Sequence, residues 1–214
     1  MKKKISIEEA VAKVKDGMTI MVAGFMANGT PNTVIEALSK TNVKNLTLIC
    51  NDSAFPDKGV GLLIVNKQVK KIITSHIGTN PVTIDQLNAK EIEVEFNPQG
   101  TLAERIRCGG AGLGGFLTPT GLGTVVQDGK QILNIGGKDF ILELPLRADV
   151  ALLGASIADE EGNLFYKATS QNFNPVMATA ADIVIAEAEQ VVKTGGIQME
   201  SVHTPAIFVD YIVN

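Results

Sequence analysis

The sequence predicts an α/β fold in which a mainly parallel β-sheet carries helices on its faces. Short apolar segments typical of buried strands alternate with segments of helical periodicity along the chain. Strands joined by helices in this way pair in parallel, because each helix returns the chain to the starting edge of the sheet. The length of 214 residues suits one large α/β domain and is short for two, so we expect a single domain over residues 1–214.

The first expected element is an amphipathic helix that ends near Gly17. Ser6 and Glu9 have the spacing of a capping box, in which each residue satisfies a backbone N–H of the other. The apolar residues that follow are Ile7, Ala10, Val11 and Val14. The next segment, residues 18–23, is continuously apolar and predicts a short strand buried on both faces.

A glycine turn leads from this strand into a second expected helix, with Thr30 as its cap and Pro31 as its first residue. Gly24 and Gly29 lack a Cβ atom, so the backbone can adopt positive φ and a ligand can approach closely. Free N–H groups at the start of a helix suit a phosphate or a carboxylate. The same glycines can also serve only to turn the chain, and the spacing alone does not separate these two interpretations.

Further strands are expected at residues 46–50, 72–74, 92–96, 140–144, 150–153 and 183–186, and helices at residues 61–65 and 81–89. The apolar residues 206–213 predict one more strand or an interface. Ligands of parallel sheets bind outside the carboxyl ends of the strands. The turns that follow strands, at residues 24–30, 51–53, 75–78 and 97–100, are therefore the candidate site.

Residues 108–124 hold seven of the 21 glycines, too many for a regular helix or strand throughout. Leu113, Phe116, Leu117 and Leu122 are interleaved with these glycines, which favours a packed loop over a flexible linker. Just before this segment, Thr101 and Glu104 have capping-box spacing, so the expected role of Glu104 is to fix the start of a helix. Gln99 offers a neutral amide that can donate to an oxyanion or carboxylate, or simply bond to the backbone of its turn.

Composition excludes several classes of function. The net charge of −4 and the lack of long basic runs argue against nucleic acid as the main partner. No apolar run approaches the roughly 20 residues that cross a bilayer, and the residues after Lys4 do not form a signal-peptide core. Cys50 and Cys108 give neither a disulfide framework nor metal-ligand spacing, and His76 and His203 are far apart. A reducing cytoplasm is the expected location.

Several segments in order resemble the α subunits of the family I coenzyme A transferases. They include DGMTIMVAGF, NPQGTLAERIRCGGAG, FLTPTGLGT and VHTPAIFVDYIV, and together with the segments between them they cover essentially the whole chain. The resemblance implies a single three-layer domain of the coenzyme A transferase superfold. It also implies an enzyme that moves coenzyme A between an acyl-coenzyme A and a short-chain carboxylate such as acetate, butyrate or acetoacetate.

The resemblance also implies a set of contact residues. Coenzyme A, as a substrate and not a permanently bound cofactor, is expected at Gly24, Phe25, Met26, Ala27, Asn28, Gly29 and Thr30. The acyl and carboxylate groups are expected near Gln99, Gly100, Gly109, Gly110, Ala111 and Gly112, and no metal site is expected. Sequences of the family normally carry Gly-Gly-Phe at the start of the turn, whereas this chain has Ala23 in place of the first glycine.

No catalytic nucleophile is expected in this chain. The family works by a ping-pong route in which a glutamate carboxylate of the β subunit attacks the thioester, and that glutamate lies in a Ser-Glu-Asn-Gly-like motif. The nearest string here is Asp-Glu-Glu-Gly-Asn at residues 159–163, where Gly precedes Asn, so Glu160 and Glu161 are interpreted as solvated turn residues. Activity is therefore expected only with a β subunit, in a heterotetramer or a larger assembly.

Two other functions remain open from the residues alone. A stand-alone enzyme of the same superfold, such as a sugar-phosphate isomerase, would use the glycine turn for phosphate. A non-catalytic module would bind coenzyme A without transferring it. The sequence leaves open the preferred acyl chain, because a methylene in an apolar pocket changes binding by only about 1–3 kcal/mol.

Overall fold

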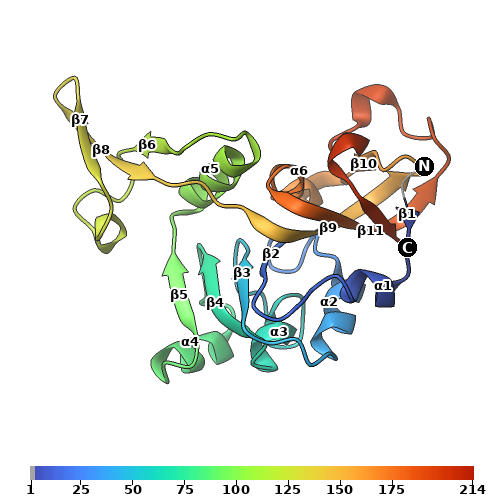
Figure 1. The fold of residues 1–214 in the computed structure, drawn as a ribbon, viewed down its shortest axis with the longest axis horizontal. Helices are drawn as coiled ribbons and strands as arrows, with labels where there is room; N and C mark the ends of the chain where they lie inside the picture. The colour runs from blue at the N-terminus through green and yellow to red at the C-terminus, as the bar shows by residue number, and fades with distance from the viewer. Residues whose placement is uncertain (1–2) are drawn as a thin grey trace.

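A nine-stranded sheet forms the centre of the computed structural model, which describes residues 3–214 (Figure 1). Its strands are β1 (Lys3–Lys4), β2 (Thr19–Val22), β3 (Leu46–Ile49), β4 (Val69–Thr74), β5 (Glu93–Phe96), β9 (Ala148–Asp159), β10 (Leu164–Phe165), β11 (Ala181–Val192) and β12 (Tyr211–Val213). The order is β1-β12-β11-β9-β2-β3-β4-β5, and β10 pairs with β9. The β9–β10 pair is antiparallel and the other pairs of this sheet are parallel, which confirms the predicted mainly parallel sheet.

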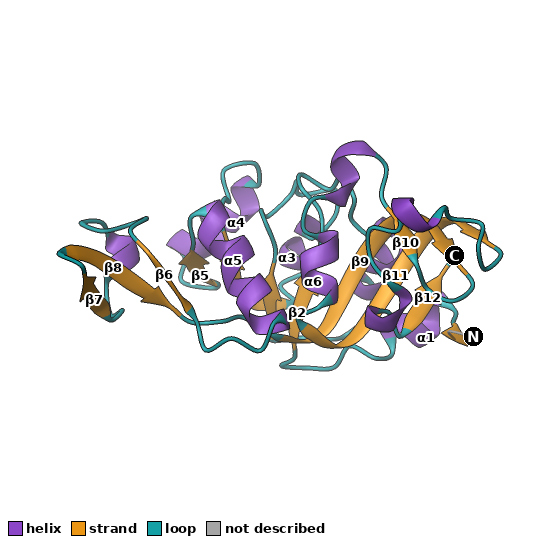
Figure 2. Cartoon of the chain, turned by 90° about the horizontal axis from the view of Figure 1, so that it is seen from above, coloured by secondary structure: helices purple, strands orange, loops and turns teal. Residues whose placement is uncertain are grey.

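Helices cover both faces of the sheet, so the molecule has three layers (Figures 1 and 2). One face carries α1 (Ile7–Val11), α2 (Asn32–Ser39), α3 (Gly61–Val65) and α4 (Pro81–Asn88), and the other carries α5 (Gln99–Gly110) and α6 (Asn174–Ala178). Alternate residues of β2 enter the two cores, with Ile20 and Val22 in one and Met21 and Ala23 in the other. This alternation follows from the two-residue period of a strand and explains why the run is apolar on every position. The predicted three-layer α/β fold is confirmed.

Two of the predicted helix starts are correct. Ser6 and Glu9 form the expected capping box of α1, although the helix ends at Val11 and is shorter than predicted. The helix predicted over residues 81–89 is α4, which the side chain of Asn80 caps by accepting from the N–H of Val82.

Two other predicted caps are wrong. Pro31 is the residue that precedes α2, and Thr30 Oγ1 instead donates to the carbonyl oxygen of Ala23 at 2.9 Å. Pro98 precedes α5, which therefore begins at Gln99, before the predicted Thr101. Thr101 is buried inside that helix, and the Glu104 carboxylate pairs with Arg107 on the next turn rather than with the helix start. The fixed φ of proline suits the start of a helix. Pro31, directly after Thr30, therefore marks the start of α2, and Pro98, which comes before Thr101, marks the start of α5.

A smaller antiparallel sheet extends from the main body, at the upper left of Figure 1. Its order is β6 (Phe116–Thr118), β8 (Lys138–Glu143) and β7 (Ile132–Ile135). The sequence predicted β8 but not β6 or β7. The glycine-rich segment is not a packed loop throughout, because it begins in the last turn of α5 and later forms β6. Short 3-10 helices lie at Val125–Gln127, Ala168–Gln171, Met199–Ser201 and Ala206–Phe208.

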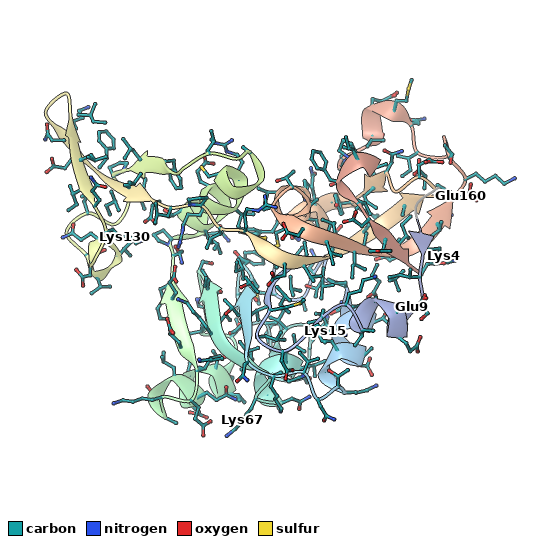
Figure 3. All side chains as sticks on the ribbon, viewed as in Figure 1. Lys4, Glu9, Lys15, Lys67, Lys130 and Glu160 are labelled. Carbon is teal, nitrogen blue, oxygen red and sulfur yellow. The ribbon has the colours of Figure 1, made fainter. Side chains whose placement is uncertain are left out.

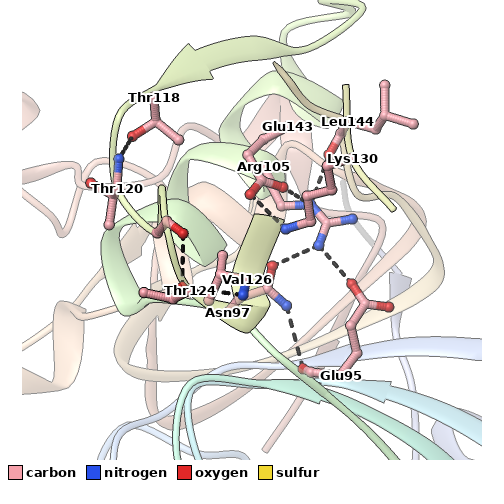
Figure 4. A network of polar contacts seen from close by, with 11 residues as sticks. Glu95, Asn97, Arg105, Thr118, Thr120, Thr124, Val126, Lys130, Glu143 and Leu144 are labelled. Carbon is pink, nitrogen blue, oxygen red and sulfur yellow. Dashed lines mark hydrogen bonds and ion pairs between the residues drawn. The ribbon is translucent and has the colours of Figure 1, made fainter. Parts of the chain in front are cut away.

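A buried polar network ties the small sheet to the main body (Figure 4). The Arg105 guanidinium donates to Glu95 and Asn97, each at 2.7 Å, and to the carbonyl oxygen of Leu144 at 2.8 Å. Burial opposes ionisation of Glu95, but hydrogen bonds and attraction from Arg105 and Lys71 outweigh it and lower the pKa of Glu95 from 4.5 to about 2. No helix within residues 3–214 is both long and apolar enough to cross a membrane.

Candidate functional site

The turn after β2 has a tight shape that local hydrogen bonds define. The N–H of Phe25 donates to the carbonyl oxygen of Asn28 at 3.0 Å, and the N–H of Asn28 donates back to Phe25 at 2.9 Å. Met26 and Ala27, between them, have φ of 49° and 64°, the left-handed values of a type I′ turn. Gly24 has φ of 128°, and a Cβ atom there would overlap Thr30 Oγ1. The predicted positive φ at position 24 is therefore confirmed, and close packing against Thr30 within the turn also requires a glycine there.

The second half of the turn lies against the segment before α6. The amide of Asn28 donates to Thr169 Oγ1 at 2.9 Å, and the amide of Asn174 donates to the carbonyl oxygen of Gly29 at 2.9 Å. A Cβ atom at Gly29 would overlap the carbonyl oxygen of Ser170. This glycine therefore permits a close approach of two backbone segments within the protein, a role that the sequence did not predict.

The N–H groups at the start of α2 are not free, contrary to the prediction. The carboxylate of Glu187, on β11, accepts from the N–H of Thr33 at 3.1 Å and of Val34 at 2.8 Å. The positive end of the helix thus already has an anion from the protein itself. A ligand at the glycine turn must therefore bind elsewhere on the turn.

The loop after β3 supports the turn from the other side. Asp52 is 5% exposed, and one of its carboxylate oxygens accepts from the N–H of Met26 at 2.9 Å and from the Asn51 amide at 2.7 Å. Its other oxygen accepts from the N–H of Ala54 at 2.8 Å. The carbonyl oxygen of the Asn51 side chain accepts from the Gln99 amide at 2.7 Å. The sequence predicted that this loop belongs to the candidate site. The hydrogen bonds that join residues 26, 52, 51 and 99 depend on the tertiary fold.

Phe25 and Gln99 meet at an open pocket of about 310 Å³. The remaining lining residues are Ala103, Asn172, Phe173 and Val176. Phe25 is 45% exposed there, although an aromatic ring is usually buried. The pocket therefore combines an apolar wall with the amides of Gln99 and Asn172, while its lining contains no carboxylate, thiol or imidazole.

The other predicted substrate-positioning residues are split between the two ends of α5. Gly100 is exposed near Gln99, but Gly109–Gly112 lie at the opposite end, about 15 Å away at 1.5 Å per helical residue. A Cβ atom at Gly109 would overlap the carbonyl oxygen of Leu146, and one at Gly110 would overlap Thr179 Oγ1. These two glycines therefore allow α5 to pack closely, while Ala111 and Gly112 are exposed. The structure does not bring the two groups together.

The chain's other reactive side chains lie outside this pocket. Glu160 is exposed in the turn between β9 and β10, as predicted (Figure 3). Glu161 lies in the same turn but is partly buried. His203 Nδ1 accepts from the N–H of Tyr166 at 3.1 Å, far along the chain from His76. Burial, and then the charge of Asp52, raise the pKa of the Cys50 thiol. Within residues 3–214, no group of three or more His, Cys, Asp or Glu side chains is placed to hold a metal ion.

Comparison with known proteins decides the family. A family model described as "Coenzyme A transferase" matches residues 4–214. The chain belongs to the coenzyme A transferase family. This coenzyme A transferase chain is 53% identical to the acetate CoA-transferase subunit alpha of Escherichia coli K12, over 99% of this chain and 96% of that protein. It is 54% identical to the acetoacetyl-CoA:acetate/butyrate CoA transferase alpha subunit of Clostridium acetobutylicum, over 98% and 96% of the two chains.

Solved structures of coenzyme A transferases share the fold of this family member. An acyl-CoA transferase from E. coli O157:H7, solved as a thioester complex with CoA, matches 99% of this chain with a TM-score of 0.88 and 23% identity. The match spans 47% of that longer chain. The glutaconate coenzyme A-transferase from Acidaminococcus fermentans matches 99% of this chain and 75% of its own, with a TM-score of 0.86 and 18% identity.

Proposed function

We propose that this chain is the alpha subunit of a heteromeric short-chain acyl-CoA:carboxylate CoA-transferase. The observation that carries the proposal is sequence identity. The chain is 53% and 54% identical, over nearly its full length, to two proteins named as CoA-transferase alpha subunits. Their names include acetate, butyrate and acetoacetyl-CoA, and we take these as the substrate class. The proposed assembly is a heterotetramer or larger, in which residues 1–214 act as one domain.

In this proposal, the Gly24–Thr30 turn contacts coenzyme A. Its exposed residues are Phe25, Met26 and Asn28, and the two apolar ones, Phe25 and Met26, are 45% and 42% exposed. The N–H groups of Phe25, Met26 and Asn28 already have acceptors within the protein, so this turn supplies shape and apolar contact rather than a cradle of free donors. The charged phosphates of coenzyme A then require donors from elsewhere, including the beta subunit.

The pocket beside Phe25 suits the short acyl group. Phe25, Phe173 and Val176 offer an apolar wall, and the Gln99 amide can donate to a carboxylate or to a developing oxyanion. Gly100 is proposed to let the substrate approach the start of α5. A second proposed contact region lies at the far end of that helix. It consists of Gly109, Gly110, Ala111 and Gly112.

The proposed reaction needs a nucleophile that this pocket lacks. A glutamate carboxylate of the beta subunit attacks the thioester carbonyl, the coenzyme A thiolate leaves, and an acyl-glutamyl anhydride forms. The thiolate then attacks the glutamyl carbonyl and releases the free acid, which leaves a glutamyl–coenzyme A thioester. A second carboxylate reverses these steps, so one thioester replaces another without ATP. This chain's role is to bind and orient the substrates.

The proposed location is the cytoplasm, where coenzyme A is a substrate and not a resident cofactor. Both cysteines are free and buried, which suits a reducing compartment. The stand-alone isomerase and the non-catalytic module are not favoured, because nearly full-length relatives at this identity are named as transferase subunits.

The test is reconstitution. This chain and its beta subunit are purified separately, and the loss of acetoacetyl-CoA with acetate as acceptor is measured for each chain and for the mixture. We expect turnover only in the mixture. Turnover by this chain alone would support a stand-alone enzyme, and binding of coenzyme A without turnover in the mixture would support a non-catalytic module.

A second measurement locates the nucleophile. The active complex is incubated with acyl-coenzyme A, and the thioester intermediate is reduced with borohydride before peptide mass spectrometry. The reduced glutamate is expected on the beta subunit. A reduced glutamate on this chain would contradict the proposal.

A further inference from the structure

Asp52 lies between the two parts of the site that the proposed function uses. It follows β3, is 5% exposed, and accepts hydrogen bonds from three donors on residues 26, 51 and 54. We propose that Asp52 is a positioning residue for the transfer reaction, which fixes the shape of the Phe25–Asn28 turn and, through Asn51, the orientation of the Gln99 amide. This inference rests on the proposed function of the chain.

The turn needs an acceptor at this place. Met26 and Ala27 both adopt left-handed φ, a conformation that is unfavourable for residues with a Cβ atom. The Met26 N–H takes no part in the Phe25–Asn28 hydrogen bonds and donates to the Asp52 carboxylate at 2.9 Å. A hydrogen bond to an ionised acceptor is stronger than one between neutral groups. Asp52 therefore holds Met26, and with it the exposed face of the turn, in one conformation.

The same carboxylate sets the direction of a relay of amides. An ionised carboxylate only accepts, so the Asn51 side chain must present its NH₂ group to Asp52 and its oxygen to Gln99. The Gln99 amide must then present an N–H to Asn51, at 2.7 Å. Gln99 is left with a second N–H for a substrate oxygen. Without a pure acceptor at position 52, both amides could turn around and present the wrong atoms.

The decisive variant is Asp52→Asn, which keeps the side-chain shape but replaces one acceptor oxygen by a donor. The matched control is Asp57→Asn, the same chemical change at an exposed aspartate in the neighbouring turn. Both variants are studied in the complete complex with the beta subunit. We expect Asp52→Asn to raise KM for acyl-CoA and to lower kcat, so that kcat/KM falls by about 10²-fold in total, the upper end of what the loss of one charge-assisted hydrogen bond produces. The control is expected to match the wild type.

Amide hydrogen exchange gives a readout that does not depend on activity. In the wild-type complex the Met26 N–H should exchange slowly although the residue is 42% exposed, and in Asp52→Asn it should exchange at least about tenfold faster. Rapid exchange of Met26 in the wild type would overturn the inference even if the variant failed to fold. Unchanged kinetics in a folded Asp52→Asn complex would overturn it as well, whatever the exchange rate.

The two proposals fail in different ways. An active wild type whose Asp52→Asn variant behaves like Asp57→Asn contradicts only the role of Asp52. A complex in which the wild type and the Asp57→Asn control are both inactive contradicts the proposed function, and the positioning role with it.

Discussion

The carboxylate of Glu187 accepts a hydrogen bond from the backbone N–H of Val34 at 2.8 Å, across 153 positions of the sequence. The second carboxylate oxygen accepts from Thr33, so β11 supplies the anion that the start of α2 would otherwise take from a ligand. The glycine turn and this helix start belong to one continuous segment, but the N–H groups of Thr33 and Val34 at the helix start already have an acceptor within the protein.

Glu187→Gln is expected to destabilise the protein without weakening substrate binding. An amide can accept from only one of the two N–H groups and presents a donor to the other, so the free energy of unfolding should fall by about 1–2 kcal/mol. Urea denaturation measures this change, and steady-state kinetics of the complex should give a KM for acyl-CoA within about twofold of the wild type. Glu189→Gln, at an exposed position on the same strand, is the control. A large rise in KM would show that the helix start binds the coenzyme.

Ala23→Gly restores the glycine that the family normally carries and is expected to leave catalysis unchanged. Ala23 is 1% exposed and belongs to the core cluster that contains Leu102 and Ile106 of α5. The loss of one buried methyl group and the added chain entropy should lower the free energy of unfolding by about 1 kcal/mol. Ala111→Gly makes the same change at an exposed position and should cost less. A KM for acyl-CoA that improves several-fold would show that the methyl group hinders binding.

Gln99→Leu tests the amide in the pocket. Removing the amide takes a donor at 2.7 Å from the buried Asn51 side chain, so the free energy of unfolding should fall by about 1–2 kcal/mol, and kcat/KM should fall by about 10²-fold if the amide donates to a developing oxyanion. Glu104→Leu, on the same helix, is the control, since its exposed pair with Arg107 contributes little to stability. Equal kcat/KM values for the two variants would show that Gln99 is not part of the site.

Local patterns predicted the main sheet and several of the helices on its faces, because the local preference of each of these segments agrees with the position that the segment takes in the fold. The continuous apolar run of β2 reflects burial on both faces, and the Asn-Pro start of α4 is a local signal that tertiary contacts do not change. The same reasoning placed Phe25 and Gln99 at strand ends, where the structure brings them to one pocket.

The rest of the site depends on contacts between distant residues. The role of Glu187 at α2 could not be predicted from its own strand, where it is one of several polar residues interspersed among apolar ones. In the glycine-rich segment, the surrounding glycines hid β6, a strand of only three residues that is held by its pairing with β8. Gly109 and Gly110 were assigned to the substrate, but their lack of a side chain serves helix packing.

The two kinds of glycine in α5 give a direct test of this packing. Gly110→Ala places a Cβ atom against Thr179 and should destabilise the protein by about 1–3 kcal/mol, as overpacked core positions do. Gly100→Ala, in the same helix, meets nothing within 4 Å and should stabilise it by up to about 1 kcal/mol. Thermal or urea unfolding of both variants measures the contrast. If Gly110→Ala were as stable as the wild type, α5 would not be held against Thr179.

Glu95 should make the stability of the protein depend on pH in the acid range. The pKa of Glu95 is lowered to about 2 in the folded protein, so the unfolded chain binds its proton more tightly. The stabilisation is therefore complete above about pH 4.5 and is lost as the pH falls toward about 2. After allowance for solvent screening of a side chain that is one-third exposed, we expect about 1–2 kcal/mol near neutral pH.

The measurement compares the wild type with Glu95→Gln by urea unfolding across this pH range. The variant cannot titrate at this position, so the difference in free energy of unfolding between the two proteins should be largest near neutral pH and should shrink on acidification. Glu93→Gln, on the same strand and paired with Lys71 at an exposed position, should show a much smaller dependence. A difference that stays constant with pH would mean that Glu95 contributes through packing or neutral hydrogen bonds. In that case Arg105 would hold the small sheet to the body mainly through Asn97, Glu143 and the carbonyl oxygen of Leu144.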